Sequence, residues 1–280
     1  MVINRDVPKS LDQRVRACRR RWHDLQRAPI RLALFGTRNA GKTSLLIALY
    51  RFRNPENEDI HLIPDESSMA YLRTQSEIFL QTGSTRHTAA AAPHRIGMRV
   101  KMEGLLWNLE TFDYSGEALA PQDESYAREL RALSTPARKQ LNHCDAVLCL
   151  HPVDCESLET LDAIDTCLAG VEAPTFFLIT KFDKVLEDHQ SPPNFNELLK
   201  KVEHGNRSIG EIRRRLSIEN RHRASGKVLP VSAFGTGFQE TDRTGSVSID
   251  SRQLRPINIH APLKHAIANR IRKLNQVGAE

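Results

Sequence analysis

No run of apolar residues in this sequence approaches the roughly 20 needed for a membrane-spanning helix. The first residues, Met1 to Asp6, are not followed by the apolar segment of a signal peptide. Aromatic residues make up only 6% of the chain, and they form no pattern with basic residues that would stack nucleic-acid bases. We therefore expect a cytoplasmic protein that does not bind nucleic acid.

Cysteine is also scarce, because the chain has five, an odd number, and none of them forms a CxxC pair. This count and spacing argue against a disulfide framework and against a zinc site. Cys149 lies in an apolar run, where a cysteine usually serves as a small core residue. All five cysteines are expected to be reduced thiols; they are Cys18, Cys144, Cys149, Cys155 and Cys167.

The chain has 280 residues, 40% hydrophobic and 26% charged, which is enough for one large α/β domain with extensions. The net charge is +6, and basic residues cluster within 14–21, 207–223 and 270–273. Such clusters attract nucleic acid, anionic lipid or an acidic partner, but they are more often solvated helix faces. Contact of the first cluster with a membrane surface is left open.

The pattern of apolar residues divides the chain into a basic N-terminal helix within 1–28 and an α/β domain over 29–280. In the domain, strands are expected near 30–36, 96–102, 105–112, 145–151, 175–180 and 227–231. Helices are expected near 42–52, 66–81, 125–141, 157–168, 195–216 and 263–274. The alternation predicts a three-layer fold around a six-stranded, mostly parallel sheet with one antiparallel strand.

Two stretches are expected to be insertions in this domain, over residues 53–90 and 190–225. The first holds a short strand candidate near 59–64 and then the helix 66–81, for which Asp65 or Ser67 is the candidate N-cap. Residues 83–92 and 234–258 are polar and rich in turn-forming residues, so both are expected to be loops.

Residues 36–43 match the phosphate-binding pattern G-x-x-x-x-G-K-[ST], between an expected strand and an expected helix. The glycines let backbone N–H groups point at phosphate oxygens, and the helix start adds its positive dipole end. Lys42 would contact the β- and γ-phosphates, and the Thr43 hydroxyl would bind Mg²⁺. The expected nucleotide-binding residues of this loop are Gly36, Asn39, Ala40, Gly41, Lys42, Thr43 and Ser44.

Asp113-Tyr114-Ser115-Gly116, after the expected strand 105–112, has the pattern D-x-x-G. With this motif and two later ones, each after an expected strand, the chain resembles the translation-factor-related (TRAFAC) GTPases, which include Ras-like proteins. The resemblance implies that Asp113 holds the hydration shell of Mg²⁺ and that the Gly116 N–H meets the γ-phosphate.

Residues 180–183, Thr-Lys-Phe-Asp, resemble the base-reading motif N-K-x-D, with Thr180 in place of the usual Asn. Asp183 would accept hydrogen bonds from the guanine N1–H and amino group, a donor pair that adenine lacks. The stem of Lys181 would pack over the base. Ser232 and Ala233 resemble the short S-A-[KL] motif that supports the guanine oxygen, with a phenylalanine at its third position.

The chain departs from the class in two ways. The first is the long stretch between the phosphate-binding loop and Asp113, where the class has a switch threonine that senses Mg²⁺ and the γ-phosphate. This threonine is assigned to Thr88, with Thr85 and then Thr82 as the next choices. Glu117 stands where Ras-like proteins have a water-orienting Gln, and it either assists hydrolysis or is a solvated helix-start residue. Two arginines, Arg38 and Arg86, are either internal arginine fingers or exposed cations.

The resemblance implies a Mg²⁺-dependent switch that binds GTP or GDP and hydrolyses GTP slowly. Lys42, Glu117 and Thr88 are the expected catalytic residues, and Thr43, Asp113 and Thr88 the expected metal ligands. The Asp-x-x-Gly-Glu sequence and the long first switch region resemble the double-GTPase branch, which implies a protein effector or a partner GTPase. A non-hydrolysing, nucleotide-dependent scaffold and an ATP-using P-loop protein remain alternatives, and the oligomeric state is open.

Overall fold

The computed structural model describes residues 28–37, 39–51, 61–82, 94–102, 105–113, 139, 141–186, 195–219, 227–235, 239–241, 247–249 and 254–277. The N-terminal helix expected within 1–28 lies outside the described residues, apart from position 28. The loop expected over 83–92 also lies outside them. Of the helix expected over 125–141, only residues 139 and 141 are described.

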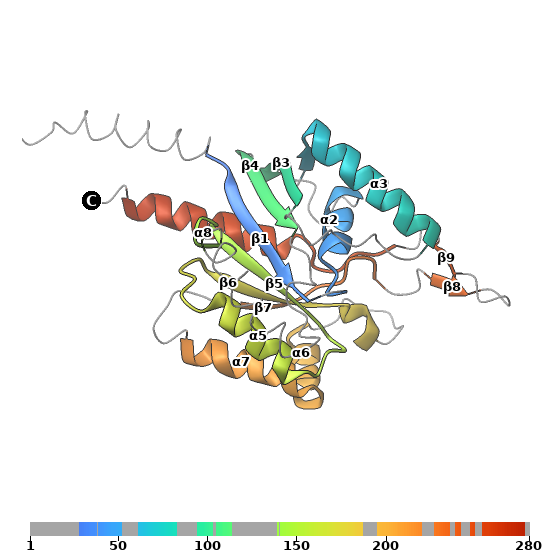
Figure 1. Ribbon diagram of the computed structural model, residues 1–280, viewed down its shortest axis with the longest axis vertical. Helices are drawn as coiled ribbons and strands as arrows, with labels where there is room; N and C mark the ends of the chain where they lie inside the picture. The colour runs from blue at the N-terminus through green and yellow to red at the C-terminus, as the bar shows by residue number, and fades with distance from the viewer. Residues whose placement is uncertain are drawn as a thin grey trace, which may run out of the picture.

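A seven-stranded sheet in the order β2-β3-β4-β1-β5-β6-β7 forms the centre of the domain (Figure 1). Strand β3 runs antiparallel to both of its neighbours, and the other pairs are parallel. The three-layer α/β fold predicted from the sequence is therefore confirmed. The strands are β1 (Ile30–Gly36), β2 (His61–Pro64), β3 (His94–Met102), β4 (Leu105–Asp113), β5 (Ala146–Pro152), β6 (Thr175–Thr180) and β7 (Lys227–Pro230).

The sheet has one strand more than the expected six because the short strand β2 joins its edge. Its residues pair antiparallel with β3, in a register that sets His61 opposite Lys101 and Pro64 opposite Met98. The expectation of a loop over 234–258 is also corrected in part. Strands β8 (Gln239–Thr241) and β9 (Val247–Ile249) lie within it and pair with each other as a separate two-stranded sheet.

Helices cover both faces of the sheet (Figure 1). One core cluster joins the sheet to α2 (Lys42–Arg51), α3 (Glu66–Thr82) and α8 (Ala261–Val277), and the other joins it to α5 (Leu158–Leu168), α6 (Phe195–Gly205) and α7 (Arg207–Glu219). Along β1, Leu32 and Leu34 belong to the first cluster, and Ala33 and Phe35 to the second. Because both faces are covered, the central strands have continuous apolar sequences.

The helix boundaries follow from short-range hydrogen bonds. Asp65 is the N-cap of α3, since its Oδ1 accepts a 2.9 Å hydrogen bond from Ser68 N. The side-chain hydrogen bond with Ser68 lowers the pKa of Asp65 despite partial burial. Residues 195–216 form two helices, which Asn206 separates, whereas Gly210 lies inside α7.

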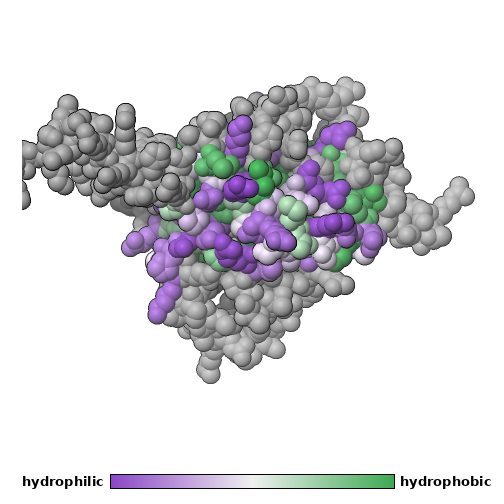
Figure 2. Space-filling model, turned by 90° about the horizontal axis from the view of Figure 1, so that it is seen from above, coloured by the Kyte–Doolittle hydropathy of each residue, from purple (hydrophilic) through white to green (hydrophobic). Residues whose placement is uncertain are grey.

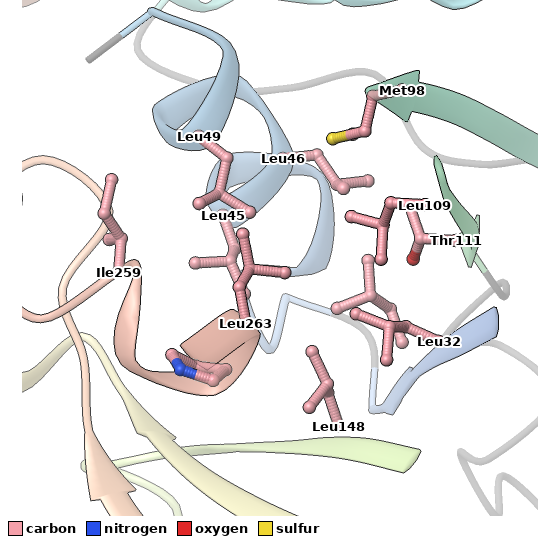
Figure 3. Close-up of a pocket in the computed structure, with 12 residues that line it drawn as sticks. Leu32, Leu45, Leu46, Leu49, Met98, Leu109, Thr111, Leu148, Ile259 and Leu263 are labelled. Carbon is pink, nitrogen blue, oxygen red and sulfur yellow. The ribbon is translucent and has the colours of Figure 1, made fainter. Parts of the chain in front are cut away.

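A small cavity lies in the first core cluster, beneath α2, and has a volume of about 10 Å³, room for roughly one water molecule (Figure 3). Its lining comes from β1, α2, β3, β4, β5 and the start of α8, and is apolar except for Thr111. The Thr111 side chain is 3% exposed, and its Oγ1 has no hydrogen-bonding partner among the described residues.

Polar and charged side chains predominate on the coloured part of the face seen from above, with a few hydrophobic groups between them (Figure 2). Large hydrophobic side chains that are exposed include Ile63, Met69 and Leu106. Among the described helices, none combines the length and the hydropathy that crossing a membrane requires.

Candidate nucleotide-binding site

The phosphate-binding loop connects the end of β1 to the start of α2, as the sequence predicts. Its turn uses positive φ angles at Asn39 (61°) and Gly41 (87°), and Ala40 N donates a 3.2 Å hydrogen bond to Thr37 O. At Gly36, where φ is 154°, an added Cβ would lie 2.5 Å from the carbonyl oxygen of Leu150 in β5. The loop therefore requires glycine at Gly36 so that it can lie against the neighbouring strand.

Lys42 brings a positive charge into this loop. Its Nζ donates hydrogen bonds of 2.8 Å to Gly36 O and of 2.8 Å to Thr37 O, and the residue is only 7% exposed. Lys42 is also the first residue of α2, where the helix dipole places partial positive charge. A buried ammonium beside a helix N-terminus is a setting that favours a phosphate.

Two residues of types that suit Mg²⁺, Thr43 and Asp113, stand at the same edge of the sheet. Thr43, the second residue of α2, is 7% exposed, and Ser44 beside it is half-buried. Asp113 is the last residue of β4, which runs parallel to β1 with Asp113 opposite Leu34. Mg²⁺ favours one or two carboxylates together with hydroxyl, water and phosphate oxygens, so Thr43 and Asp113 fit it by chemistry. The described residues contain no group of three His, Cys, Asp or Glu side chains able to hold a metal.

The segment expected to read the base contacts the phosphate-binding loop directly. Thr180 ends β6, is 5% exposed, and donates a 2.7 Å hydrogen bond from Oγ1 to Ala40 O. Lys181 follows with a φ of 55°, which turns the chain into the short 3-10 helix η2 (Phe182–Val185) containing Asp183. One hydrogen bond thus connects the end of β6 with the loop before α2.

Asp183 and Ser232, identified from separate motifs, are in contact. The Ser232 hydroxyl donates a hydrogen bond to Asp183 Oδ1 and accepts one of 3.0 Å from Gly235 N. The two segments are also joined through the backbone, since Phe182 N donates to Val231 O at 3.3 Å. The Ser232 N–H donates to Ile257 O at 3.0 Å, so Ser232 acts on this site through its hydroxyl. Its neighbour Ala233 is half-buried.

Two features of this region were not predicted from the sequence. Asp154, after β5, forms ion pairs with Lys181 (Oδ1 to Nζ, 3.9 Å) and Lys184 (Oδ2 to Nζ, 2.5 Å). Burial alone would raise the pKa of Asp154, but the Lys184 hydrogen bond and the charges of both lysines lower it. Phe234, where the related motif has Lys or Leu, stacks on Phe79 of α3 with ring centroids 3.9 Å apart.

Several predicted site residues lie outside the described residues, and their roles stay predictions. They are Arg38, Thr85, Arg86, Thr88, Gly116 and Glu117. Thr82, the third choice for the switch threonine, is the last residue of α3, and its hydroxyl donates a 2.9 Å hydrogen bond to Ile78 O. The described part of the site therefore comprises the phosphate-binding loop and the two segments around Asp183 and Ser232.

No protein-family model matches this sequence, and no curated protein matches it significantly. Among solved structures, a bacterial selenocysteine-specific elongation factor, EF-Sec, is similar with a TM-score of 0.41 and 14% identity, over 88% of this chain and 29% of that one. The elongation factor SelB from Methanococcus maripaludis, in complex with the GTP analogue GppNHp, has a TM-score of 0.38 and 16% identity, over 73% and 30%. This chain thus spans less than a third of either protein, at identities too low to transfer a function.

Proposed function

We propose that this chain binds guanine nucleotide and hydrolyses GTP to GDP and phosphate as a conformational switch of the TRAFAC type. One observation carries the proposal: the Thr180–Ala40 hydrogen bond joins the phosphate-binding loop to the segment containing Asp183. A base and its phosphates are held together in a nucleotide, so a nucleotide site needs these two regions next to each other. The location of both at the carboxyl ends of parallel strands is typical of ligand sites in α/β sheets.

Selection of guanine would depend on Asp183. A carboxylate only accepts hydrogen bonds, and guanine offers it the N1–H and the 2-amino group, whereas adenine has an acceptor at N1. Because Ser232 donates to Oδ1 of this carboxylate, its orientation is restrained before a base arrives. We expect Lys181, at the start of the same turn, to cover one face of the base with its aliphatic stem.

At the phosphates, Lys42 would leave the carbonyls of Gly36 and Thr37 and neutralise the β- and γ-phosphates. Mg²⁺, held by Thr43 and Asp113, would withdraw charge from the phosphate oxygens when bound. Hydrolysis adds water to the γ-phosphorus and breaks its bond to the β–γ bridging oxygen. We assign orientation of that water to Glu117 and sensing of the γ-phosphate to Thr88 and Gly116, so that loss of phosphate releases both loops to a protein partner.

Displacement of fluorescent GDP from the purified chain in Mg²⁺ tests the base assignment, with GTP, ATP and xanthosine triphosphate as competitors. We expect GTP to displace the probe and ATP to fail. In Asp183→Asn, the amide should weaken GTP binding and favour xanthosine triphosphate, because an amide can donate to the xanthine 2-oxo group. Equal competition by GTP and ATP in the wild type would overturn the guanine assignment in favour of an ATP-using P-loop protein.

Glu117 also supports a second function, that of a scaffold that binds GTP or GDP without hydrolysing it. A carboxylate near the γ-phosphate repels a charged group, whereas the glutamine of Ras-like proteins does not. Single-turnover phosphate release separates the two functions. Turnover by the wild type supports the switch, whereas turnover that appears only in Glu117→Gln supports the scaffold.

A further inference from the structure

Behind the base-reading segment lies a buried polar cluster formed by His151 at the end of β5 and by Asn206 and Ser208 at the junction of α6 and α7. His151 and Ser208 are both 0% exposed, and Asn206 is 6% exposed. All three side chains contact the loop of residues 153–155. The proposed binding of a nucleotide makes no use of this cluster, so its presence in an apolar layer needs another explanation.

Asn206 uses the two ends of its amide for different tasks. Its Oδ1 accepts hydrogen bonds from Ser208 N (3.0 Å) and Ile209 N (3.2 Å), which makes it the N-cap of α7. Its Nδ2 donates to Val153 O (2.9 Å) and Cys155 O (3.1 Å), on either side of Asp154. The opposite amide orientation would set donor against donor and acceptor against acceptor, so the partners define the orientation.

His151 and Ser208 contact the same loop, residues 153–155, at Cys155 O. Ser208 Oγ donates a 2.6 Å hydrogen bond to Cys155 O, and His151 Nε2 lies 2.8 Å from Ser208 Oγ and 3.2 Å from Cys155 O. Burial lowers the pKa of His151, which favours the neutral form of its ring. Its Nδ1 has no hydrogen-bonding partner among the described residues. We therefore take Nε2 as the protonated nitrogen, which donates toward Ser208 Oγ and Cys155 O.

The loop held in this way contains Asp154, which reaches the base-reading segment. Its carboxylate pairs with Lys181 before Asp183 and with Lys184 after it, so that it spans the turn containing Asp183. The backbone adds a second link, because Val153 N donates a 2.9 Å hydrogen bond to Thr180 O. A continuous series of contacts therefore runs from the α6–α7 junction through Asp154 to both sides of Asp183.

We propose that Asp154, held in place by Asn206, is a positioning residue that determines how well the site distinguishes guanine from related bases. This inference depends on the proposed function, because it assigns a supporting residue to the same site. Asp154 acts through Lys181 and Lys184 and need not touch the nucleotide. If the turn is no longer fixed, Asp183 loses the alignment that a two-point contact with guanine requires, while the phosphate contacts remain.

Binding of GDP and of inosine diphosphate, measured side by side, tests this assignment. Inosine diphosphate keeps the phosphates and the N1–H but lacks the 2-amino group, so the ratio of the two dissociation constants reports the alignment of Asp183. The first variant, Asp154→Asn, removes the charge that pairs with both lysines. We expect the ratio to fall by about 3-fold, with little change for inosine diphosphate, since exposed ion pairs contribute modestly.

The second variant, Asn206→Asp, keeps the acceptor that caps α7 and removes the amide donors to Val153 O and Cys155 O. Val153 O then loses its amide donor, Cys155 O keeps only its contacts with Ser208 and His151, and a carboxylate faces both carbonyls, so we expect the ratio to fall by about 10-fold. Asp162→Asn is the matched control. Asp162 lies on α5, on the same side of the sheet as α6 and α7, and forms an ion pair with Arg215 at 2.8 Å. This control should keep the wild-type ratio.

The outcomes separate the inference from the function on which it rests. An unchanged ratio in both Asp154→Asn and Asn206→Asp, with a wild type that prefers guanine, overturns the inference alone. Equal weakening of GDP and inosine diphosphate in both variants also overturns it, since that result indicates general destabilisation. A wild type without any preference for guanine over adenine overturns the proposed function, and the inference with it.

Discussion

The hydroxyl of Thr180 donates a 2.7 Å hydrogen bond to the carbonyl oxygen of Ala40, a residue 140 positions earlier in the chain. Thr180 stands where the related base-reading motif has Asn. The bond explains how threonine can replace asparagine at this position. The threonine hydroxyl is also a hydrogen-bond donor, and the Ala40 carbonyl lies close enough for this shorter side chain to reach. The same bond holds the end of β6 against the loop before α2, which ties the two halves of the proposed site together.

Replacing Thr180 with valine should weaken both the fold and the site. Thr180→Val keeps the shape of the side chain but leaves a carbonyl without this donor, for a loss of about 1 kcal/mol in the free energy of unfolding. We also expect weaker binding of GDP. Urea denaturation and displacement of fluorescent GDP measure the two effects. Thr180→Ser, which keeps the hydroxyl, is the control, and equal stability of Thr180→Val and wild type would contradict the prediction.

The sequence alone predicts the parts of this fold that local chemistry determines. Strand β1 and helix α2 have the expected starts, because continuous burial and the glycine-rich loop define them. Asp65 is the N-cap of α3, one of the two residues proposed for it. The place of β2 could not be predicted, since a strand of four residues has no local signal for its partner.

The remaining differences are long-range in origin. Residues 234–258 are polar and lack strand periodicity, yet β8 and β9 pair within them, because pairing depends on a neighbour and not on local pattern. At the site, the motifs identify Asp183 and Ser232, but nothing in the sequence predicts that Asp154 pairs with Lys181 and Lys184. Such a contact depends on the spatial order of strands β5 and β6.

Thr111 offers a test of the core beside the cavity in Figure 3. Its Oγ1 is buried and has no hydrogen-bonding partner among the described residues. Folding therefore removes water from this hydroxyl without replacing the hydrogen bonds that water made. Thr111→Val replaces the hydroxyl with a methyl group of similar size. We expect the free energy of unfolding to increase by about 1 kcal/mol, measured by urea denaturation.

The matched variant is Thr111→Ser, which keeps the hydroxyl and removes the methyl group. Loss of buried apolar volume next to a cavity should lower the free energy of unfolding by about 1 kcal/mol. The two variants should therefore shift stability in opposite directions. A Thr111→Val protein less stable than the wild type would indicate that the hydroxyl has a partner, such as a bound water.

Stability should fall as the pH drops below 6.5, and His260 is a main cause. Burial, with a smaller effect from the nearby charge of Lys264, lowers the pKa of His260 from 6.5 to about 4. Between these two values the unfolded chain binds a proton that the folded chain does not, so folding becomes less favourable as the pH falls. Burial lowers the pKa of His151 in the same direction.

Urea denaturation at pH 7.5 and pH 5 measures this effect, and we expect a loss of about 1–2 kcal/mol at the lower pH from His260. Carboxylates with lowered pKa values, such as Asp65 and Glu211, remain ionised over this range and contribute little change. In His260→Gln the loss should be smaller than in the wild type. An identical pH dependence in the two proteins would contradict the assignment.

Gly235 connects backbone geometry with the base-reading site. It has a φ of 81°, and its N–H donates a 3.0 Å hydrogen bond to Ser232 Oγ, the hydroxyl that donates to Asp183. An added Cβ would lie 2.1 Å from Arg255 O, and that atom belongs to backbone, which cannot move aside as a flexible side chain can. Gly235→Ala should therefore lower the free energy of unfolding by about 2 kcal/mol or more and weaken binding of GDP.

Gly170 is the matched control, because it also has a positive φ, 76°, but none of the described residues has an atom within 4 Å of an added Cβ there. Gly170→Ala carries only the conformational cost, about 1 kcal/mol, and lies at the end of α5 away from Ser232. Its affinity for GDP should equal that of the wild type. If the two alanine variants lose the same stability and both keep full GDP affinity, contact with Arg255 does not fix the turn that orients Asp183. A loss of affinity confined to Gly235→Ala indicates that this turn holds the carboxylate in place through Ser232.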